Sequence, residues 1–492
     1  MDTKTFLSQF RHMYDVIVVG CGASGVAAMS RLAECNLQVL GLEADSRIGG
    51  RINSVKFGEG LIDLGAEWCH GEDNNIVYSI VRDHKVLKEP TGEHDITFID
   101  SSGEFLAPEL SMKFSGIWME VANATNTKMV NSRRSLGEHF TEEYWQLINT
   151  KYSDVDKGLA ADLLEWFQKY ENSINASDTW FEASGRGHLE YWECEGNSQL
   201  HWQGKGYKTL LDIMLGKYPD PEKELPVEIL FEKTVSKIDW STGYFGYEKA
   251  EDYVKVLCKD GTEYHTKFVI VTVSIGVLQE NYMTMFYPAL PNNKVNSILG
   301  LTLGTVDKIF VMFEKPWWDE TFKWVGFVWK GDDRSMFVGG DAWLLEIFGI
   351  NTSEHNPNIL CGWLSGSAAR HMETLDIEVV QDGFHRLLCH FLGKQYTIPM
   401  PAKILRSAWY SNPHTRGSYT FRSMLSEEMQ ARAQQLACPV FNVSGAPVLC
   451  FGGEATSTHY FSTVHGAVEA GYREANRLIK YIKNTEFVQS QL

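Results

Sequence analysis

Residues 14–54 read YDVIVVGCGASGVAAMSRLAECNLQVLGLEADSRIGGRINS and contain two apolar runs separated by a glycine-rich turn. The first run is rich in β-branched residues and ends at Gly20, which is typical of a buried parallel strand. A second apolar run ends at Glu43. Between the runs the apolar residues recur with helical spacing. Four of them can share one face of a helix: Val26, Met29, Leu32 and Ala33.

The turn carries three glycines in the pattern Gly20-x-Gly22-x-x-Gly25. The first permits a tight turn, the second lets the backbone approach a phosphate, and the third lets helix and strand pack closely. The start of the helix offers free N–H groups to a pyrophosphate. Glu43, about 20 residues on, is placed to accept hydrogen bonds from ribose hydroxyls. These features predict a Rossmann-like dinucleotide site.

The continuation ADSRIGGRINS favours FAD over a nicotinamide cofactor. Gly49 and Gly50 bring a second backbone turn close to the first. Arg51 can neutralise a phosphate, and Arg47 can assist it. Nicotinamide sites do not usually carry this second turn directly after the ribose acid.

Composition limits the class of partner. The 492 residues fit two or three domains. Lys plus Arg is 45 and Asp plus Glu is 63, so the net charge is −18. This argues against nucleic acid and would attract cations such as polyamines, although simple solubility is the default explanation of the charge. No apolar run reaches the roughly 18 residues of a membrane span, so no membrane partner is expected.

The cysteines and the chain ends bear on the compartment. The nine cysteines are scattered, which indicates reduced thiols rather than disulfides or a metal site. The first residues lack the pattern of a secretory signal, and the last residues do not match a peroxisomal address. A cytoplasmic protein is therefore expected.

Further motifs extend along the chain. With the opening stretch they resemble the flavin-containing amine oxidase family, closest to the animal polyamine oxidases (spermine oxidase and acetylpolyamine oxidase). The motifs are RIGGR at 47–51, DLGAEWCHG at 63–71, TVDKIFVMFEKPWW at 305–318, SNPHTRGSYTF at 411–421 and FGGEATSTHYFSTVHGAVEAGYREANRL at 451–478.

The resemblance implies an α/β (α+β two-domain) fold with a tunnel to the flavin at the domain interface. A Rossmann-like, discontinuous FAD-binding domain is expected over 12–90, 200–291 and 404–483. A substrate domain of mixed sheet and helices is expected over 91–199 and 292–403. Residues 1–11 and 484–492 are expected to be flexible termini.

The resemblance also implies the FAD contacts. FAD is expected to bind without a covalent bond, because Ser418 stands where monoamine oxidases attach the flavin through a cysteine. The residues expected to line the cofactor are Gly20, Gly22, Ser24, Gly25, Glu43, Arg51, Gly65, Ala66, Trp68, Val235, Trp409, Glu454, Thr463 and Val464.

Two residues are expected to be catalytic. Lys308 lies in an apolar strand pattern, and from that pattern alone it is a strand-edge lysine facing solvent. The resemblance instead implies that it holds a water near flavin N5. His70 is by default a hydrogen-bonded core histidine, whereas the resemblance implies that it faces the substrate and bonds an amine or water.

Other residues are expected to bind substrate. Tyr419 matches one wall of the family's aromatic cage, which favours a cation. The second wall is a tyrosine in monoamine oxidases and Thr463 here, which argues against that activity. Glu193 and Glu195 match the tunnel lining that meets distal amines, although a solvated loop is equally consistent with either. Glu67 departs from the small or neutral residues usual at its position, and contacts either the substrate or only the flavin loop.

The expected function is an FAD-dependent polyamine oxidase acting on spermine or an N-acetylated polyamine. A hydride passes from the amine α-carbon to flavin N5, the imine hydrolyses to an aldehyde and a smaller amine, and O2 gives H2O2. The alternatives are an oxidase of another amine or amino acid, for which Arg416 is the one candidate carboxylate clamp, and a flavin-bearing binding protein without turnover. A histone demethylase is disfavoured because no coiled-coil insertion is evident. A monomer is slightly favoured.

Overall fold

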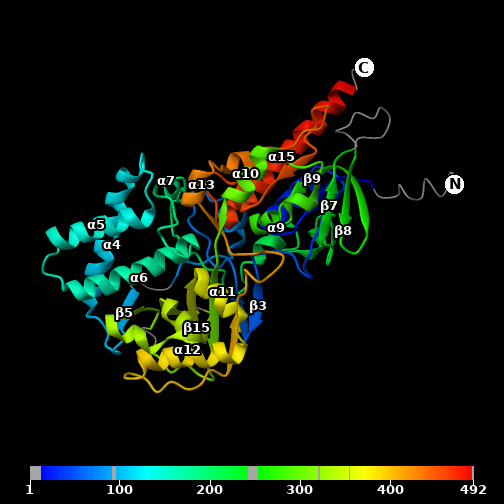
Figure 1. The fold of residues 1–492 in the computed structure, drawn as a ribbon. Coiled ribbons are helices and arrows are strands. Elements are labelled where there is room, and N and C mark those ends of the chain that lie inside the picture. Colours follow the sequence, from blue (N-terminus) through cyan, green and yellow to red (C-terminus); the bar gives the residue numbers. More distant parts are fainter. Residues whose placement is uncertain (1–12, 91–95, 242–252, 320–321, 354, 490–492) are drawn as a thin grey trace.

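The computed structural model describes residues 13–90, 96–241, 253–319, 322–353 and 355–489. Two sheets form the centres of two lobes, and a group of helices projects from the second lobe as an arm (Figure 1). The first lobe is built on an eight-stranded sheet, and the second on a six-stranded sheet. The expected α/β, two-domain class is confirmed.

The sheet of the first lobe combines a parallel half with an antiparallel meander. β6, β2, β1, β9 and β18 are neighbours in parallel, and β7, β8 and β9 pair antiparallel. Val18 of β1 lies opposite Gly41 of β2 and Ile270 of β9. The strands are β1 (Met13–Val19), β2 (Val39–Leu42), β6 (Glu228–Leu230), β7 (Val235–Asp239), β8 (Val254–Cys258), β9 (Glu263–Val271), β10 (Phe286–Tyr287) and β18 (Leu449–Phe451).

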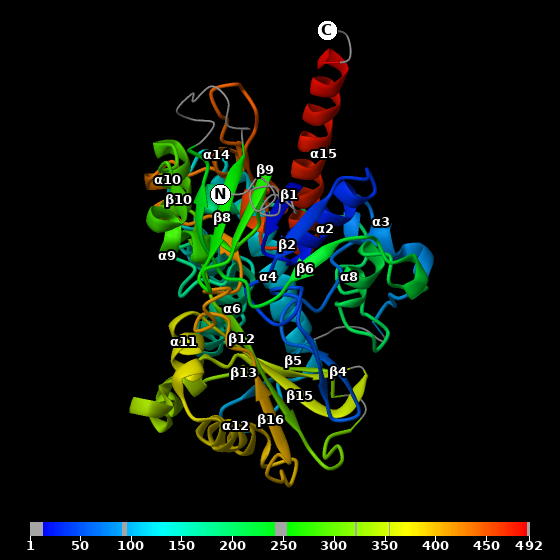
Figure 2. The same ribbon diagram turned by 90° about the vertical axis from the view of Figure 1, so that its right-hand side faces the viewer.

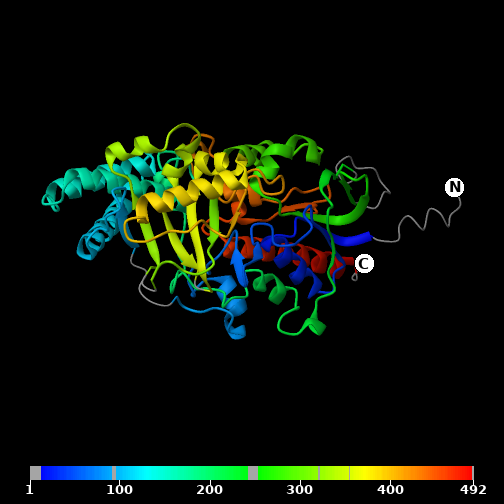
Figure 3. The same cartoon turned by 90° about the horizontal axis from the view of Figure 1, so that it is seen from below.

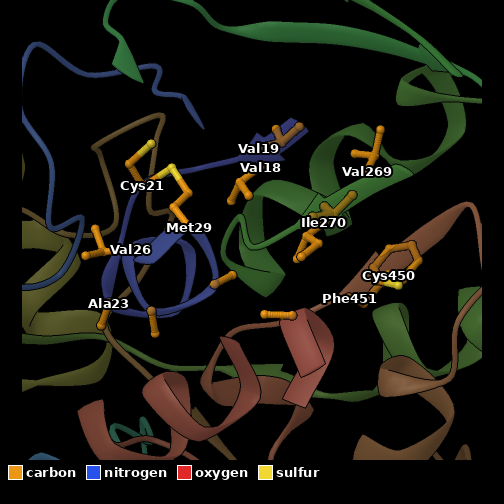
Figure 4. Close-up of a cluster of buried hydrophobic side chains, with 14 of the residues drawn as sticks. Val18, Val19, Cys21, Ala23, Val26, Met29, Val269, Ile270, Cys450 and Phe451 are labelled. Carbon is orange, nitrogen blue, oxygen red and sulfur yellow. The ribbon is translucent and has the colours of Figure 1, made fainter. Parts of the chain in front are cut away.

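The first lobe's core joins both ends of the chain. Figure 4 shows part of it, with Val18 of β1, Met29 of α2 (Ala23–Ala33), Ile270 of β9 and Phe451 of β18 drawn as sticks. The face that the sequence predicts for the first helix is buried. The remaining helices of this lobe are α3 (Ile76–Val81), α8 (Thr209–Met214), α9 (Ile275–Met285), α10 (Asn292–Gly300), α13 (Met424–Glu428), α14 (Ala433–Ala437) and α15 (Val464–Gln489).

In the second lobe, successive side chains of β12 point to opposite faces of the sheet, and the two faces pack against different parts of the protein. Ile309 and Val311 pack on the α12 side, whereas Phe310 points to the opposite face. Figures 2 and 3 show α12 across the outer face of this sheet. The elements are β5 (Ile96–Asp100), β12 (Val306–Met312), β13 (Trp324–Val328), β14 (Gly349–Ser353), β15 (Asn356–Ser365), β16 (Lys403–Arg406), α11 (Gly366–Thr374) and α12 (Ile377–Leu392).

The arm has its own aromatic core. Trp118, Phe140 and Trp180 pack together there, and Phe98 of β5 joins them to the six-stranded sheet. The last turn of α6 reaches back to the space between the lobes. The arm comprises α4 (Pro108–Met129), α5 (Leu136–Thr150), α6 (Lys157–Asn175) and the short α7 (Gly185–His188).

Two small antiparallel sheets of two strands each lie apart from the large sheets. β3 (Ser54–Phe57) pairs with β4 (Gly60–Asp63), and β11 (Thr302–Leu303) with β17 (Thr420–Phe421). Phe57 and Ile62 pack against Phe310 of the second lobe. The 3-10 turns are Arg82–His84, Pro221–Lys223, Gly331–Met336, Gly339–Glu346 and Glu454–Thr456.

The chain boundaries differ in two places from those expected. Residues 292–303 were expected in the substrate domain, but Ile298 and Leu301 are buried in the first lobe's core. We propose that the FAD-binding domain extends to about residue 303, since burial assigns this segment to it. Residues 484–489 continue α15, whereas a flexible tail was expected there. The expected tail over 1–11 lies outside the described residues.

Two further properties concern the described part of the chain. No helix within the described ranges is long and apolar enough to cross a membrane. All nine cysteines are free thiols, in agreement with the expectation from their spacing.

The packing of α2 against α15 yields a stability prediction. A Cβ at Gly471 would lie 2.1 Å from the carbonyl oxygen of Ser24, so Gly471→Ala forces the helices apart. We expect the free energy of unfolding to fall by about 1–3 kcal/mol, measured by thermal or urea unfolding. Gly116→Ala in α4 is the matched control, because no atom lies within 4 Å of its added Cβ. It is expected to stabilise by about 0.5–1 kcal/mol. Equal effects of the two changes would contradict the packing argument.

Candidate active site

A cavity of about 1040 Å³ runs between the two lobes. This is at the upper end of the range of roughly 300–1,000 Å³ for ligand pockets. Its walls come from the glycine turns after β1 and β2, from β12 and β15 of the second lobe, and from the end of α6. The cavity therefore spans the dinucleotide cradle and the expected substrate side.

The two glycine turns meet at one end of the cavity. Gly22 and Gly49 form a parallel bridge, and the Gly49 N–H donates to the Cys21 carbonyl at 2.8 Å. Gly20 and Gly49 have φ of +93° and +110°, which disfavour any side chain. A Cβ on Gly22 would find only the Gly49 oxygen, at 3.8 Å, so the space beside it is open.

This cradle fits a dinucleotide. No side chain caps the N-terminus of α2, so its first N–H groups are free to meet a phosphate. Gly25 lies outside the cavity lining, and its role is packing, because a Cβ there would lie 2.0 Å from the Gly20 oxygen. Packing is the task that its place in the motif predicts, but Gly25 was also expected to line the cofactor, and it is absent from the cavity wall.

Glu43 is held in place by backbone donors. Its two carboxylate oxygens accept from the Cys21 N–H at 2.7 Å and from the Asp45 N–H at 2.9 Å. Burial raises the pKa of Glu43, and these bonds oppose the rise. Each oxygen keeps a second lone pair that can accept a ribose hydroxyl. Val235, at the start of β7, lines the same end of the cavity.

Arg51 and Glu454 join distant parts of the chain at the cavity wall. Arg51 Nη1 donates to Glu454 Oε1 at 2.8 Å and to the Ser418 carbonyl at 2.7 Å. Glu454 Oε2 accepts from Thr420 and from the Ser462 N–H. Burial alone would raise the pKa of Glu454, but the Arg51 charge and these hydrogen bonds hold it below its usual value.

Arg47 has a structural task as well as its place in the lining. Its guanidinium donates to the carbonyls of Ile48, Gly50 and Ile52 at 2.9–3.2 Å. It therefore holds the second glycine turn in shape. Arg51, rather than Arg47, is the cation with donors left over for a phosphate.

Lys308 is buried, with only 4% of its surface exposed, so it does not face solvent as its strand pattern alone suggests. Nζ donates to the carbonyls of Asp63 at 3.1 Å and Gly65 at 2.9 Å, and to Glu67 Oε2 at 2.5 Å. It also lies 4.6 Å from the centre of the Trp363 ring. Because Lys308 shares its face of β12 with Phe310, it points toward the cavity rather than toward α12.

His70 presents an acceptor to the cavity. Its Nδ1–H donates to the Ser198 carbonyl at 2.7 Å, which leaves Nε2 with a free lone pair in the neutral ring. Burial lowers the pKa of His70, and the bond to Ser198 opposes this only in part. The ring is therefore neutral near pH 7 and can accept an N–H from an amine.

Other residues predicted from the sequence also line the cavity. Tyr419 donates its O–H to the Ser173 carbonyl of α6 at 2.5 Å, which fixes its ring at the cavity wall. Thr463 Oγ1 accepts from the Gly466 N–H and caps α15. The other predicted residues that line the cavity are Gly20, Ser24, Gly65, Ala66, Trp68, Glu193, Trp409 and Val464.

Three expectations need revision or refinement. Glu195 lies outside the cavity lining, whereas Glu193 on the same loop lines it, and both residues are exposed. Arg416 lines the cavity, but its guanidinium forms a bidentate pair with Glu280 at 2.7 and 2.8 Å. Ser418 exchanges hydrogen bonds with both backbone groups of Val306 at 2.8 Å, so its hydroxyl is engaged with β12.

The sequence did not identify Trp363 or Asp63. Trp363 of β15 lies opposite Lys308 in the strand register and stacks on Trp68, with ring centres 5.6 Å apart. Its strand is more than 50 residues from Lys308, so only the pairing of β12 with β15 reveals it. Asp63 accepts from Ser54 and from the Tyr207 N–H. Burial and the charge of Glu67 raise its pKa to about 6.

The fold and the cradle are those of a dinucleotide-binding protein. A family model described as flavin containing amine oxidoreductase matches residues 23–479, and the chain belongs to this family. The human peroxisomal N(1)-acetyl-spermine/spermidine oxidase is 30% identical over 497 residues, with 94% of each chain covered. The probable polyamine oxidase 5 of Arabidopsis thaliana is 26% identical, covering 95% of this chain and 98% of the relative.

A solved structure agrees on the fold. A putrescine oxidase redesigned in its cofactor binding matches with a TM-score of 0.68 and 18% identity, covering 95% of this chain and 99% of that chain. The resemblance, the FAD cofactor and the enzyme class expected from the sequence are confirmed. The protein is a flavin-containing amine oxidase, with an amine and oxygen as its reactants.

The Arg51–Glu454 pair yields a prediction with a defined pH dependence. Arg51→Ala leaves the Glu454 carboxylate buried without its cation, and we expect a loss in unfolding free energy on the order of 3 kcal/mol near neutral pH. The depressed pKa of Glu454 stabilises the wild type above about pH 4.5, and this contribution is lost as the pH falls through the folded-state pKa. In the variant the pKa rises, so acid relieves the buried charge.

The difference between the two proteins should therefore shrink as the pH falls from about 7 to about 4, measured by urea unfolding. Arg51→Lys keeps the charge and serves as the matched control, with a smaller loss expected. A difference that is the same at both pH values would show that Glu454 does not depend on Arg51 for its charge.

Proposed function

We propose that the protein oxidises polyamines. The observation that carries the proposal is the chemistry of the cavity wall beyond the cradle. It presents a neutral imidazole at His70, the carboxylates of Glu67 and Glu193, and the rings of Trp68 and Tyr419. Carboxylates and aromatic faces bind cations, and the free Nε2 of His70 accepts an amine N–H. A long, flexible cation with several nitrogens suits these separated groups.

FAD, when bound, accepts a hydride from the carbon next to the amine nitrogen, and oxygen then takes up the electrons to give hydrogen peroxide. The chain supplies the positions. Gly22, Gly49 and Arg51 would hold the cofactor's phosphates, and Trp409 and Thr463 would border its ring. His70 orients the nitrogen that is oxidised, and this nitrogen must be neutral for the hydride to leave its neighbouring carbon.

Free polyamines are favoured over acetylated ones by charge. Glu193 lines the cavity, and the described residues give its carboxylate no ion-pair partner. A carboxylate here attracts a distal ammonium and gains nothing from an acetylated nitrogen. The human and plant relatives, named as an acetyl-spermine/spermidine oxidase and a probable polyamine oxidase, support the broader substrate class.

Two alternatives lose support. An amino-acid oxidase needs a cation for the substrate carboxylate, and Arg416 is already paired with Glu280. A flavin-binding protein without turnover does not need Lys308 and His70 to line one cavity, as they do. The cytoplasmic location, the monomeric state and the non-covalent attachment of FAD stay predictions from the sequence.

The first test is anaerobic reduction of the bound flavin. The purified yellow protein is mixed in turn with spermine, spermidine, N-acetylated spermine, a monoamine and an amino acid, and the flavin absorbance is followed. We expect free spermine or spermidine to bleach the flavin fastest. Dithionite is the control that the flavin can be reduced. Bleaching by dithionite but by none of the amines would refute the proposal.

The second test compares the effects of removing the charge from two glutamates on the same loop. Glu193→Gln is expected to raise KM for spermine about tenfold and to leave KM for a monoamine unchanged, since one charged hydrogen bond is lost. Glu195→Gln makes the same charge change on an exposed residue outside the cavity lining, and is expected to alter neither value. Equal effects of the two variants would indicate that only the overall negative charge matters.

A further inference from the structure

The three N–H groups of Lys308 are all in use. An ammonium group has three donors and no acceptor. Nζ donates to the carbonyls of Asp63 and Gly65 and to Glu67 Oε2 at 3.1, 2.9 and 2.5 Å. In this arrangement Lys308 has no donor left for a water, which differs from the role that the resemblance implies for it. The group of this ion pair that is available to a ligand in the cavity is the carboxylate of Glu67.

Glu67 is the accessible member of the pair. The Lys308 side chain is 5% exposed and that of Glu67 is 24% exposed. Both line the cavity. Only Oε2 of Glu67 has a hydrogen-bond partner among the described residues, and that partner is Lys308. An occupant of the cavity therefore meets a carboxylate with an available oxygen, held in place by a buried ammonium.

The surroundings of this carboxylate suit a cation. The indoles of Trp68 and Trp363 stack on one another beside it, with ring centres 5.6 Å apart and planes at 16°. Lys308 Nζ already lies 4.6 Å from the Trp363 ring centre and 5.7 Å from that of Trp68. Indole faces attract ammonium groups, and these rings already accommodate one.

The charged groups around Glu67 carry more negative than positive charge, which favours binding of a cation. Asp63 and Glu67 are two acids beside the single ammonium of Lys308, and the charge of Glu67 adds to the burial that raises the pKa of Asp63. The carboxylate of Asp63 is bonded to Ser54 and to the Tyr207 N–H, while Lys308 takes only its carbonyl. Once both acids are ionised, the group carries one net negative charge, which a substrate ammonium neutralises.

We propose that Glu67 binds a second ammonium group of the substrate, one that is not oxidised, and thereby selects amines that carry at least two nitrogens. The inference rests on the proposed function. A carboxylate stabilises the protonated form of any nitrogen that it contacts, whereas the oxidised nitrogen must be neutral. The nitrogen at Glu67 is therefore a neighbour of the reacting one, which is left to the neutral imidazole of His70.

Equilibrium binding to the reduced enzyme tests this without turnover. The flavin is reduced with dithionite under anaerobic conditions, and spermidine and butylamine are titrated in by calorimetry. Glu67→Gln keeps the shape and removes the charge. We expect it to weaken spermidine binding about tenfold or more, and to change butylamine binding less than about twofold.

Two further variants control for folding and for net charge. Glu59→Gln removes an exposed acid from the β3–β4 hairpin and is expected to leave both affinities as in the wild type. Glu67→Asp keeps a carboxylate but shortens it, and is expected to reduce the preference for spermidine less than Glu67→Gln does. The flavin content and thermal midpoint are recorded for each variant. If Glu67→Gln loses its flavin, Glu67→Asp provides the test.

The outcomes separate this inference from the function on which it rests. An unchanged ratio of spermidine to butylamine affinity in the Glu67 variants, in an enzyme whose flavin spermidine reduces, overturns the role of Glu67 alone. Glu67 is then only the structural partner of Lys308. A wild-type flavin that no amine reduces overturns the polyamine oxidase itself, whatever the Glu67 variants do.

Discussion

The contact between two backbone turns, at Gly22 and Gly49, is the constraint on which the rest of the molecule depends. It brings the end of the first strand and the loop after the second strand to one point without any side chain between them. That leaves an open space lined by N–H groups at the start of α2. Gly49 is required there by its positive φ and by the close approach of the Ile52 oxygen, and Gly22 leaves the space beside it open, so the cradle is a property of the backbone.

The second constraint is the set of buried charges that hold the lobes around the cavity. Arg51 comes from the loop after β2, and Glu454 from the segment after β18, some 400 residues later. Lys308 extends from the second lobe to carbonyls of the loop after β4. In both cases a cation satisfies acceptors from distant segments. Such pairs cost free energy to desolvate, and they are placed where a ligand and substrate need fixed walls.

The sequence predicts the parts of this design that are local. The glycine pattern, the distance to Glu43 and the helical spacing after Gly25 lie within one βαβ unit, and the structure agrees with each. Features that depend on contacts between distant segments could not be predicted from the local sequence pattern. Trp363 becomes part of the site only through its register with Lys308. Glu193 and Glu195 differ only in which way their loop turns. The α10 helix and the following Leu301 join the first lobe, although they lie beyond residue 291, where one segment of that lobe was expected to end.

The order in which the first lobe receives its strands has a consequence for synthesis on the ribosome. β1 and β2 emerge first, but β18 and α15, which complete the sheet and cover α2, come from residues 449–489. At the usual elongation rate of about 5–20 residues per second, the apolar surface of α2 waits roughly 20–90 s for α15, and that of β9 waits roughly 10–40 s for β18. During that interval the nascent chain presents an unfinished hydrophobic face. Chaperones that recognise such faces therefore have most of the translation time in which to act, and a chain that ends early cannot complete its first lobe.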